Sequence, residues 1–247
     1  MGRWNNLLYL SGNDIPFAAA AINIHPPRIK DIAIIGEENF YSGVEFLKFD
    51  KDILSEEDKI HLENKSNFEV LIAIMNEQNI TIQKQRTQIE MVLALLFPDY
   101  IVEIKPTYIS FIHNGEENKI DNTNYEEFKK ILKHMFCLDS DREDGSEYNP
   151  AGDMAKRIAD KLKRRHQRIA QTQEGENKVS ILEKYVSILA VGEQKDMNSL
   201  LNYTVYQLFD ELKRYQLKLS WDIHLKAQLA GAQNLQEVED WMKDIHP

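Results

Sequence analysis

Acidic side chains with the spacing of a metal site are the first feature to test in this 247-residue chain. Asp139 and Asp141 alternate as the first ligands of a calcium-binding EF-hand loop do. Such a loop needs glycine at its sixth position and glutamate at its twelfth, but counting from Asp139 those positions hold Asp144 and Pro150. The calcium pattern therefore fails, and the polar stretch 139–152 is interpreted as an acidic linker or exposed loop.

No combination of residues in the sequence forms a recognisable catalytic or cofactor site. The sequence lacks an HExxH zinc motif, a Walker loop, a GxGxxG turn and a GxSxG nucleophile elbow. The histidines do not pair at the spacing of metal ligands; they are His25, His61, His113, His134, His166, His224 and His246. The single cysteine, Cys137, excludes an internal disulfide and lies in an apolar segment where a buried, inert thiol is expected. We therefore expect a non-enzymatic protein with no catalytic, cofactor-binding or metal-binding residues.

One basic cluster, the segment 156–168 (KRIADKLKRRHQR), has the charge to contact the phosphates of a nucleic acid. Its positive side chains are Lys156, Arg157, Lys161, Lys163, Arg164, Arg165 and Arg168. No aromatic side chain interleaves to stack on bases, and Ile158 and Leu162 give the segment an ordinary apolar seam. Residues 1–150 carry 15 Lys/Arg and 26 Asp/Glu, a net charge of −11, whereas residues 151–247 carry 15 and 14, a net charge of +1. A solvated helix face, or a dock for the acidic N-terminal part, is favoured over a nucleic-acid site.

The N-terminal part is predicted to be mostly helical after an extended start. Residues 4–25 contain the apolar run PFAAAAINI and lead into a double proline, which favours a strand or an extended arm. Helical spacing of apolar residues and capping signals then predict five helices, of which 81–97 is a longer one. They cover 27–35, 37–47, 81–97 and the segments that begin at Ser55 and Asn67.

The pattern changes from helical to alternating near residue 100. YIVEIKPTYISFIHNGEENKID alternates apolar and polar side chains around Asn114-Gly115, which predicts a small antiparallel β-ribbon near 100–120. A capped helix follows in NYEEFKKILKHMFCL, and from Asp153 onward the chain is predicted to be helical almost throughout. The fold class is therefore α+β and mainly α. The predicted parts are an acidic α+β N-terminal part (1–138), the acidic linker (139–152) and an all-helical C-terminal part (153–247).

The longest predicted helix, 199–232, has an apolar surface wider than one packed seam requires. From Leu201 to Leu219 an apolar residue recurs at spacings of 4, 3, 4, 3 and 4, a period typical of helices that pack along one another. Such a helix either lies in the core and is contacted on two sides, or exposes part of its surface to another protein. Under the second interpretation the candidate partner-binding residues are Leu201, Val205, Tyr206, Leu208, Phe209, Leu212, Tyr215 and Trp221.

Three segments resemble proteins encoded in the tail gene clusters of tailed bacteriophages, a group identified as tail assembly or baseplate hub assembly chaperones. They are the C-terminal LLNYTVYQLFDELKRYQLK with LQEVEDWMKDIHP, the stretch IDNTNYEEFKKILKHMFCL, and the N-terminal IPFAAAAINIHPPRIKDIAIIGEENFYSGVEFL. The resemblance covers most of the chain and brings no functional residue with it. It implies a protein that holds tape-measure, hub or baseplate components until assembly, or one that is built into the virion.

Composition and resemblance together favour a function in protein–protein binding. A net charge of −10 does not suit general nucleic-acid binding, and no stretch approaches the 18 apolar residues of a transmembrane helix. We expect a phage tail or baseplate assembly factor in the cytoplasm of the infected host or in the virion, with other phage proteins as partners and no membrane or cofactor. An oligomer is left open. A structural virion protein and a nucleic-acid adaptor that uses the basic segment are the alternatives.

Overall fold

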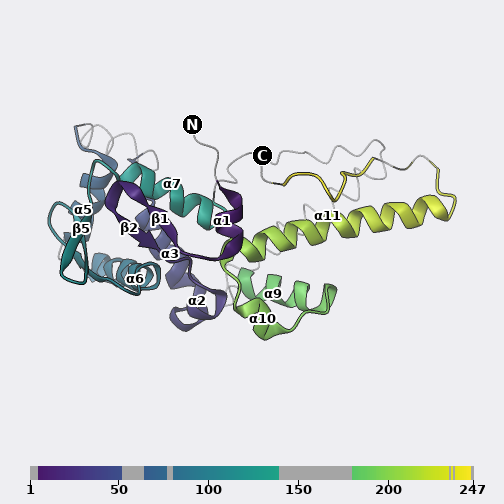
Figure 1. Cartoon of the computed structure of the whole chain (residues 1–247), viewed down its shortest axis with the longest axis horizontal. Coiled ribbons are helices and arrows are strands. Elements are labelled where there is room, and N and C mark those ends of the chain that lie inside the picture. Colours follow the sequence, from purple (N-terminus) through teal and green to yellow (C-terminus); the bar gives the residue numbers. More distant parts are fainter. Residues whose placement is uncertain are drawn as a thin grey trace.

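Two small antiparallel sheets lie among helices, and one long helix leads away from them (Figure 1). The computed structural model describes residues 5–51, 64–76, 80–138, 180–233, 235 and 237–245. Within them the protein is α+β and mainly helical, which confirms the predicted fold class. Three predicted features lie outside the described residues: the helix after Ser55, the acidic linker 139–152 and the basic segment 156–168.

The chain begins with a short helix, so the prediction of an extended arm over 4–25 is wrong for this first stretch. Helix α1 (Asn6–Ser11) ends at Gly12, whose left-handed φ of 67° closes the last turn. Tertiary packing selects the helix, because it buries Tyr9 to 3 % exposure against rings of two later helices. A six-residue helix has no stability of its own in water and needs such contacts.

The predicted strand character of the following residues is found as a hairpin around a turn of alanines. Strands β1 (Ile15–Phe17) and β2 (Ile22–Ile24) pair antiparallel, with Ile15 opposite Ile24. The 3₁₀ turn η1 (Ala18–Ala20) connects them. The apolar side chains of both strands are buried and the residues between them are exposed, which is the alternation expected of a half-buried strand.

Four helices of the N-terminal part form at or within two residues of the predicted segments. They are α2 (Ile29–Ile35), α3 (Glu37–Leu47), α5 (Asn67–Asn76) and α6 (Ile80–Leu96). Helices α3 and α6 approach closely at Gly43, where an added Cβ atom would lie 2.6 Å from the carbonyl oxygen of Gln88. This approach buries Phe40 and Val44 of α3 completely.

A three-stranded ribbon follows, as the alternating pattern predicts. Strands β3 (Ile101–Ile104), β4 (Ile109–His113) and β5 (Glu116–Ile120) pair antiparallel in the order β3-β4-β5. The turn between β4 and β5 is Asn114-Gly115, and both residues have positive φ, as a two-residue hairpin turn requires. Helix α7 (Tyr125–Met135) then packs its buried stripe into the core.

The described C-terminal residues form helices α9 (Ile181–Gly192), α10 (Met197–Leu201) and α11 (Val205–Leu229). Figure 1 shows α11 starting beside α1 and projecting beyond the two sheets and helices α9 and α10. After Leu229 the described residues contain turns and no further helix, so the expectation of helix almost to the end of the chain does not hold there. One continuous core joins the described residues of the N-terminal and C-terminal parts.

Candidate interaction surfaces

The first half of α11 is part of the core. The Thr204 hydroxyl caps the helix by accepting from the amide of Gln207, and the Gln207 side-chain oxygen accepts in return from the amide of Thr204. The Nε2 group of Gln207 donates to the carbonyl of Leu10. Among the predicted partner-binding residues, four are buried in this half: Val205, Tyr206, Leu208 and Leu212. Three more, Leu201, Phe209 and Tyr215, are half-buried against the same core. These seven side chains therefore contribute to the core of this chain, four of them buried and three in part.

An aromatic cluster fixes the base of α11 to the N-terminal part. The rings of Tyr9 and His134 meet edge to face with centroids 4.5 Å apart, and Tyr206 lies 5.4 Å from each of them. The Nε2 atom of His134 lies 3.1 Å from the Oδ1 atom of Asn6. Burial raises the pKa of the Tyr206 phenol above its usual range, so this hydroxyl stays protonated in the folded protein.

Helix α9 is clamped at its first turn by an acidic side chain from α3. Glu37 accepts hydrogen bonds from the amides of Ile181 and Leu182 at 3.1 and 3.3 Å, and from the hydroxyl of Ser180. A carboxylate suits this place because the amides at the start of a helix lack partners and carry partial positive charge. The end of α9 meets α11, where the Tyr215 ring lies against Gly192.

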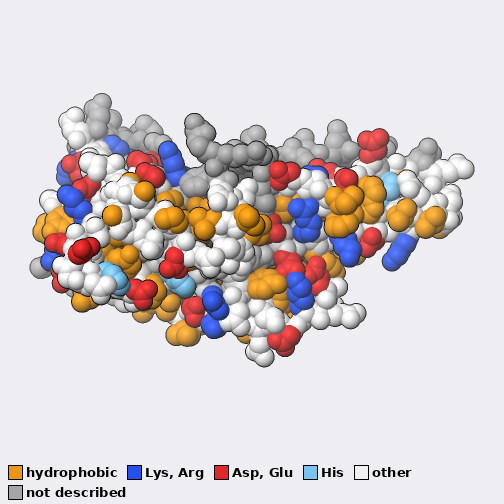
Figure 2. Space-filling view, in the orientation of Figure 1, with side chains coloured by type: hydrophobic (Ala, Val, Ile, Leu, Met, Phe, Trp, Pro, Cys, Tyr) orange, Lys and Arg blue, Asp and Glu red, His pale blue; other side chains and the backbone are white. Residues whose placement is uncertain are grey.

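The second half of α11 exposes apolar side chains to solvent. Leu219, Ile223, Leu225 and Leu229 are 45 %, 59 %, 45 % and 80 % exposed. Figure 2 shows hydrophobic side chains gathered along this projecting part of the molecule. Trp221, the remaining predicted partner-binding residue, is half-buried in the same half. The apolar stripe of the core therefore continues outward onto a helix surface that is open to water.

The described C-terminal segment packs against another side of α11, near its middle. Arg214 donates to the backbone carbonyls of Trp241 and Lys243 at 2.6 and 2.8 Å. Ile245 is buried to 4 % exposure. The described residues of this segment form no helix or strand, and hydrogen bonds from side chains of α11 take the place of some of the backbone hydrogen bonds that such an element would supply. It leaves the leucine and isoleucine side chains of the projecting half exposed.

A second exposed apolar row lies on α9. Ile181, Ile188 and Val191 are 51 %, 36 % and 78 % exposed, while Leu182, Val186 and Leu189 of the same helix are buried. A helix with apolar residues on both its inner and its outer faces has more apolar surface than its packing within this chain uses. The rows on α9 and on the projecting half of α11 are therefore the best candidates for contact with other proteins.

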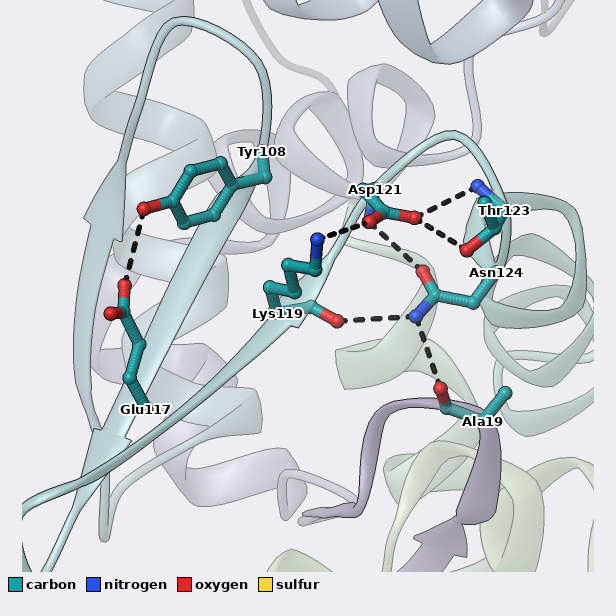
Figure 3. A network of polar contacts seen from close by, with 7 residues as sticks. All are labelled: Ala19, Tyr108, Glu117, Lys119, Asp121, Thr123 and Asn124. Atoms are coloured by element: carbon teal, nitrogen blue, oxygen red, sulfur yellow. Dashed lines mark hydrogen bonds and ion pairs between the residues drawn. The ribbon is translucent and has the colours of Figure 1, made fainter.

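A polar hollow of about 550 Å³ lies between the alanine turn η1 and strand β5 (Figure 3). Asp121 accepts from the amide and the hydroxyl of Thr123 at 2.9 and 2.6 Å and pairs with Lys119 at 2.9 Å. These hydrogen bonds, from Thr123 first, lower the pKa of Asp121 to about 2. Asn124 accepts from the Asp121 amide and donates to the carbonyls of Lys119 and Ala19.

Each polar group of this hollow that could act in chemistry is already engaged within the chain. A carboxylate with a pKa near 2 is a poor general base at neutral pH, because its proton affinity is too low. The arrangement instead ties the β5–α7 connection to the alanine turn, which is a structural role. In the sequence, the spacing of Asp121 and Thr123 is a local turn signal just before the helix predicted in NYEEFKKILKHMFCL.

The described residues contain no group of three or more His, Cys, Asp or Glu side chains placed to hold a metal ion. In the same residues, no helix combines the length and the apolar character needed to cross a membrane. The lone thiol, Cys137, is half-buried at the end of α7. The basic segment 156–168 lies outside the described residues, so its proposed contact with nucleic acid stays a prediction.

Comparison with known protein families gives a match that falls on the C-terminal part. Residues 173–246 match the family model described as the YomV second domain. This is a phage-derived family, which indicates a phage origin for the chain. No curated protein and no solved structure matches. The matched region contains α9, α10 and α11, and thus both exposed apolar rows.

Proposed function

We propose that this protein is a non-enzymatic bacteriophage assembly factor that binds tail or baseplate components through the apolar helical surfaces of its C-terminal part. The observation that carries the proposal is the pair of exposed apolar rows on α9 and on the projecting half of α11. Single exposed apolar residues are ordinary, but rows of them at helical spacing are typical of protein-binding surfaces. The phage-derived match to the region that holds both rows supports a phage partner.

The way in which α9 and α11 are anchored supports a binding role for them. The base of α11 is fixed by Tyr9, His134 and Tyr206, and the start of α9 is fixed by Glu37. Both helices are therefore held firmly while their outer faces remain open. A pre-organised surface loses little conformational entropy when a partner binds, so it binds more tightly than a disordered segment of equal area.

Mass spectrometry of purified phage particles beside the lysate that produced them tests the proposal. An assembly factor is abundant in the lysate and absent from particles. Stoichiometric protein in the particles would instead assign it as a structural tail or baseplate component, the second candidate function. Absence of any effect on tail formation when the gene is deleted would overturn both.

A surface variant tests the role of the α9 row directly. Val191 is 78 % exposed, so Val191→Glu leaves the fold intact and places a charge in the proposed contact. The yield of tailed particles in a complementation assay is expected to fall at least tenfold. The matched control is Ile101→Glu on strand β3, which is 65 % exposed and belongs to the ribbon far from α9 and α11, and it should leave the yield unchanged.

A further inference from the structure

The exposed end of α11 carries a sequence that reads similarly in both directions. From Leu219 to Leu229 the chain is LSWDIHLKAQL, and His224 is its centre. Leu219 corresponds to Leu229, Ile223 to Leu225, and the acid Asp222 to the base Lys226 across this centre. Each apolar residue mirrors another apolar residue, and each charge mirrors the opposite charge.

We propose that two copies of this chain associate through this segment. Their α11 helices lie antiparallel, and the two-fold axis crosses them at the height of residue 224. A two-fold contact uses the same patch on both copies, so residue i of one meets residue j of the other and the reverse. The mirrored order of apolar and charged residues meets that requirement. This inference refines the proposed function, because it assigns the α11 row to a second copy and leaves the α9 row for other phage proteins.

The heights of the exposed apolar residues along α11 agree with this antiparallel pairing. At about 1.5 Å of rise per residue, antiparallel pairing about His224 places Leu219 level with Leu229 of the second copy. It places Ile223 level with Leu225 in the same way. These four residues are the large apolar residues that this half of α11 exposes, and each lies level with another of them in the second copy. Pairing would therefore reduce the exposure of all four together.

The charges select the second copy over an unrelated apolar helix. Asp222, which is half-buried, and Lys226, which is exposed, lie one turn apart on α11, between the row Leu219–Ile223 and the row Leu225–Leu229. Neither forms an ion pair with another described residue. Antiparallel pairing about His224 brings Asp222 of each copy beside Lys226 of the other, so two ion pairs form. A shift of the centre by two residues, to Asp222, would bring Asp222 beside its own counterpart and set Lys218 against Lys226.

The projecting half offers the room that such pairing needs. Helix α9 ends at Gly192 against Tyr215, so it covers α11 only up to that level. The C-terminal segment lies on the side of Arg214 and leaves the leucine rows exposed. Figure 1 shows the end of α11 well clear of the sheets and of α9 and α10. A second helix can therefore lie along residues 219–229 without meeting the described part of the body.

Sedimentation velocity of the purified full-length protein over a concentration series tests the association. The weight-average mass is expected to rise from 28.8 kDa toward twice that value. Asp222→Lys sets two positive charges together across the contact, and Lys226→Asp sets two negative charges together, so each variant alone should stay at the monomer mass. Mixing the two variants brings opposite charges together again and should restore the dimer. A wild-type protein that is monomeric at every concentration, or a mixture that stays monomeric, overturns the proposal.

Cysteine cross-linking tests the register independently. In antiparallel pairing about His224, Ile223 lies about 3 Å in level from Ile223 of the second copy, and Leu219 lies about 15 Å from its counterpart. Packed helix axes lie about 8–10 Å apart, so a bifunctional thiol reagent that spans about 10 Å bridges the first pair and does not reach across the second. Ile223→Cys should therefore cross-link to itself and Leu219→Cys should not, with the wild-type protein as the control for Cys137. Cross-linking of both variants would indicate parallel helices and overturn the proposal. These assays contain no phage component, so their failure leaves the proposed function standing.

Discussion

The two halves of α11 should respond differently to the same substitution. Leu208 lies at the base of the helix and is fully buried, whereas Leu219 lies on the projecting half and is 45 % exposed. Leu208→Ala removes side-chain atoms from a packed site and leaves a cavity, which costs about 3 kcal/mol of unfolding free energy. For a chain of this length that loss lowers the Tm by roughly 10 °C.

Leu219→Ala should cost much less. Nearly half of the Leu219 surface already faces water, and no packed wall surrounds the atoms that are removed. The loss is limited to the transfer of the remaining buried area, about 1 kcal/mol, which lowers the Tm by roughly 3 °C. Thermal unfolding followed by circular dichroism compares the two variants, at protein concentrations where the chain is monomeric.

Equal destabilisation by the two variants would refute the division of α11 into a core half and an exposed half. Two further leucines extend the comparison within the same helix. Leu212, at 6 % exposure, should behave as Leu208 does, and Leu225, at 45 % exposure, should behave as Leu219 does. A loss of unfolding free energy that declines gradually along the helix, without a step between Leu212 and Leu219, would also contradict this division.

Three other perturbations test the fold. Gly43→Ala places a Cβ atom 2.6 Å from the Gln88 carbonyl oxygen, so it should destabilise the protein by about 2 kcal/mol in urea titration, whereas an unchanged midpoint would contradict the close α3–α6 approach. Asp121 has a pKa lowered to about 2, so its stabilising contribution, about 1 kcal/mol after solvent screening, should be present above pH 4 and lost as the pH falls from 4 to 2. The Asp121→Asn variant should lack that loss. Burial raises the pKa of the Tyr125 phenol, so stability should fall as the pH rises above about 10, and Tyr125→Phe should reduce this slope in alkaline denaturation.

Local signals in the sequence located most of the described elements. Glycine after an apolar stripe marks the end of α2 at Gly36, and Asn114-Gly115 marks the hairpin turn between β4 and β5. Helix α3 has the predicted bounds 37–47, because its apolar spacing and its ends are both encoded within the segment. Such signals depend only on neighbouring residues, so they can be read without knowledge of the fold.

Features that depend on distant residues were not predictable. Helix α1 forms because Tyr9 meets His134 and Tyr206, which lie more than 100 residues away in the chain. The same limit applies to α11. Leu212 and Leu219 occupy equivalent places in one periodic stripe, yet α9 and the core cover the first and leave the second open. Periodicity defines the face of a helix, and only the tertiary fold decides how far along the helix that face is covered.

The length of α11 makes the geometry of its base important for any contact at its tip. A continuous helix of 25 residues spans about 37 Å, so a tilt of roughly 10° at the base moves the tip by about 6 Å. Side chains that interlock across an interface do not tolerate a displacement of that size. The direction of α11, and with it any contact at its tip, therefore depends on the buried cluster of Tyr9, His134 and Tyr206 and on the hydrogen bond from Gln207 to Leu10, although none of these residues lies on the exposed rows. A substitution that loosens this base without unfolding the chain should weaken contacts at the exposed row of α11 and leave contacts at the α9 row, whose helix is held by Glu37, unchanged.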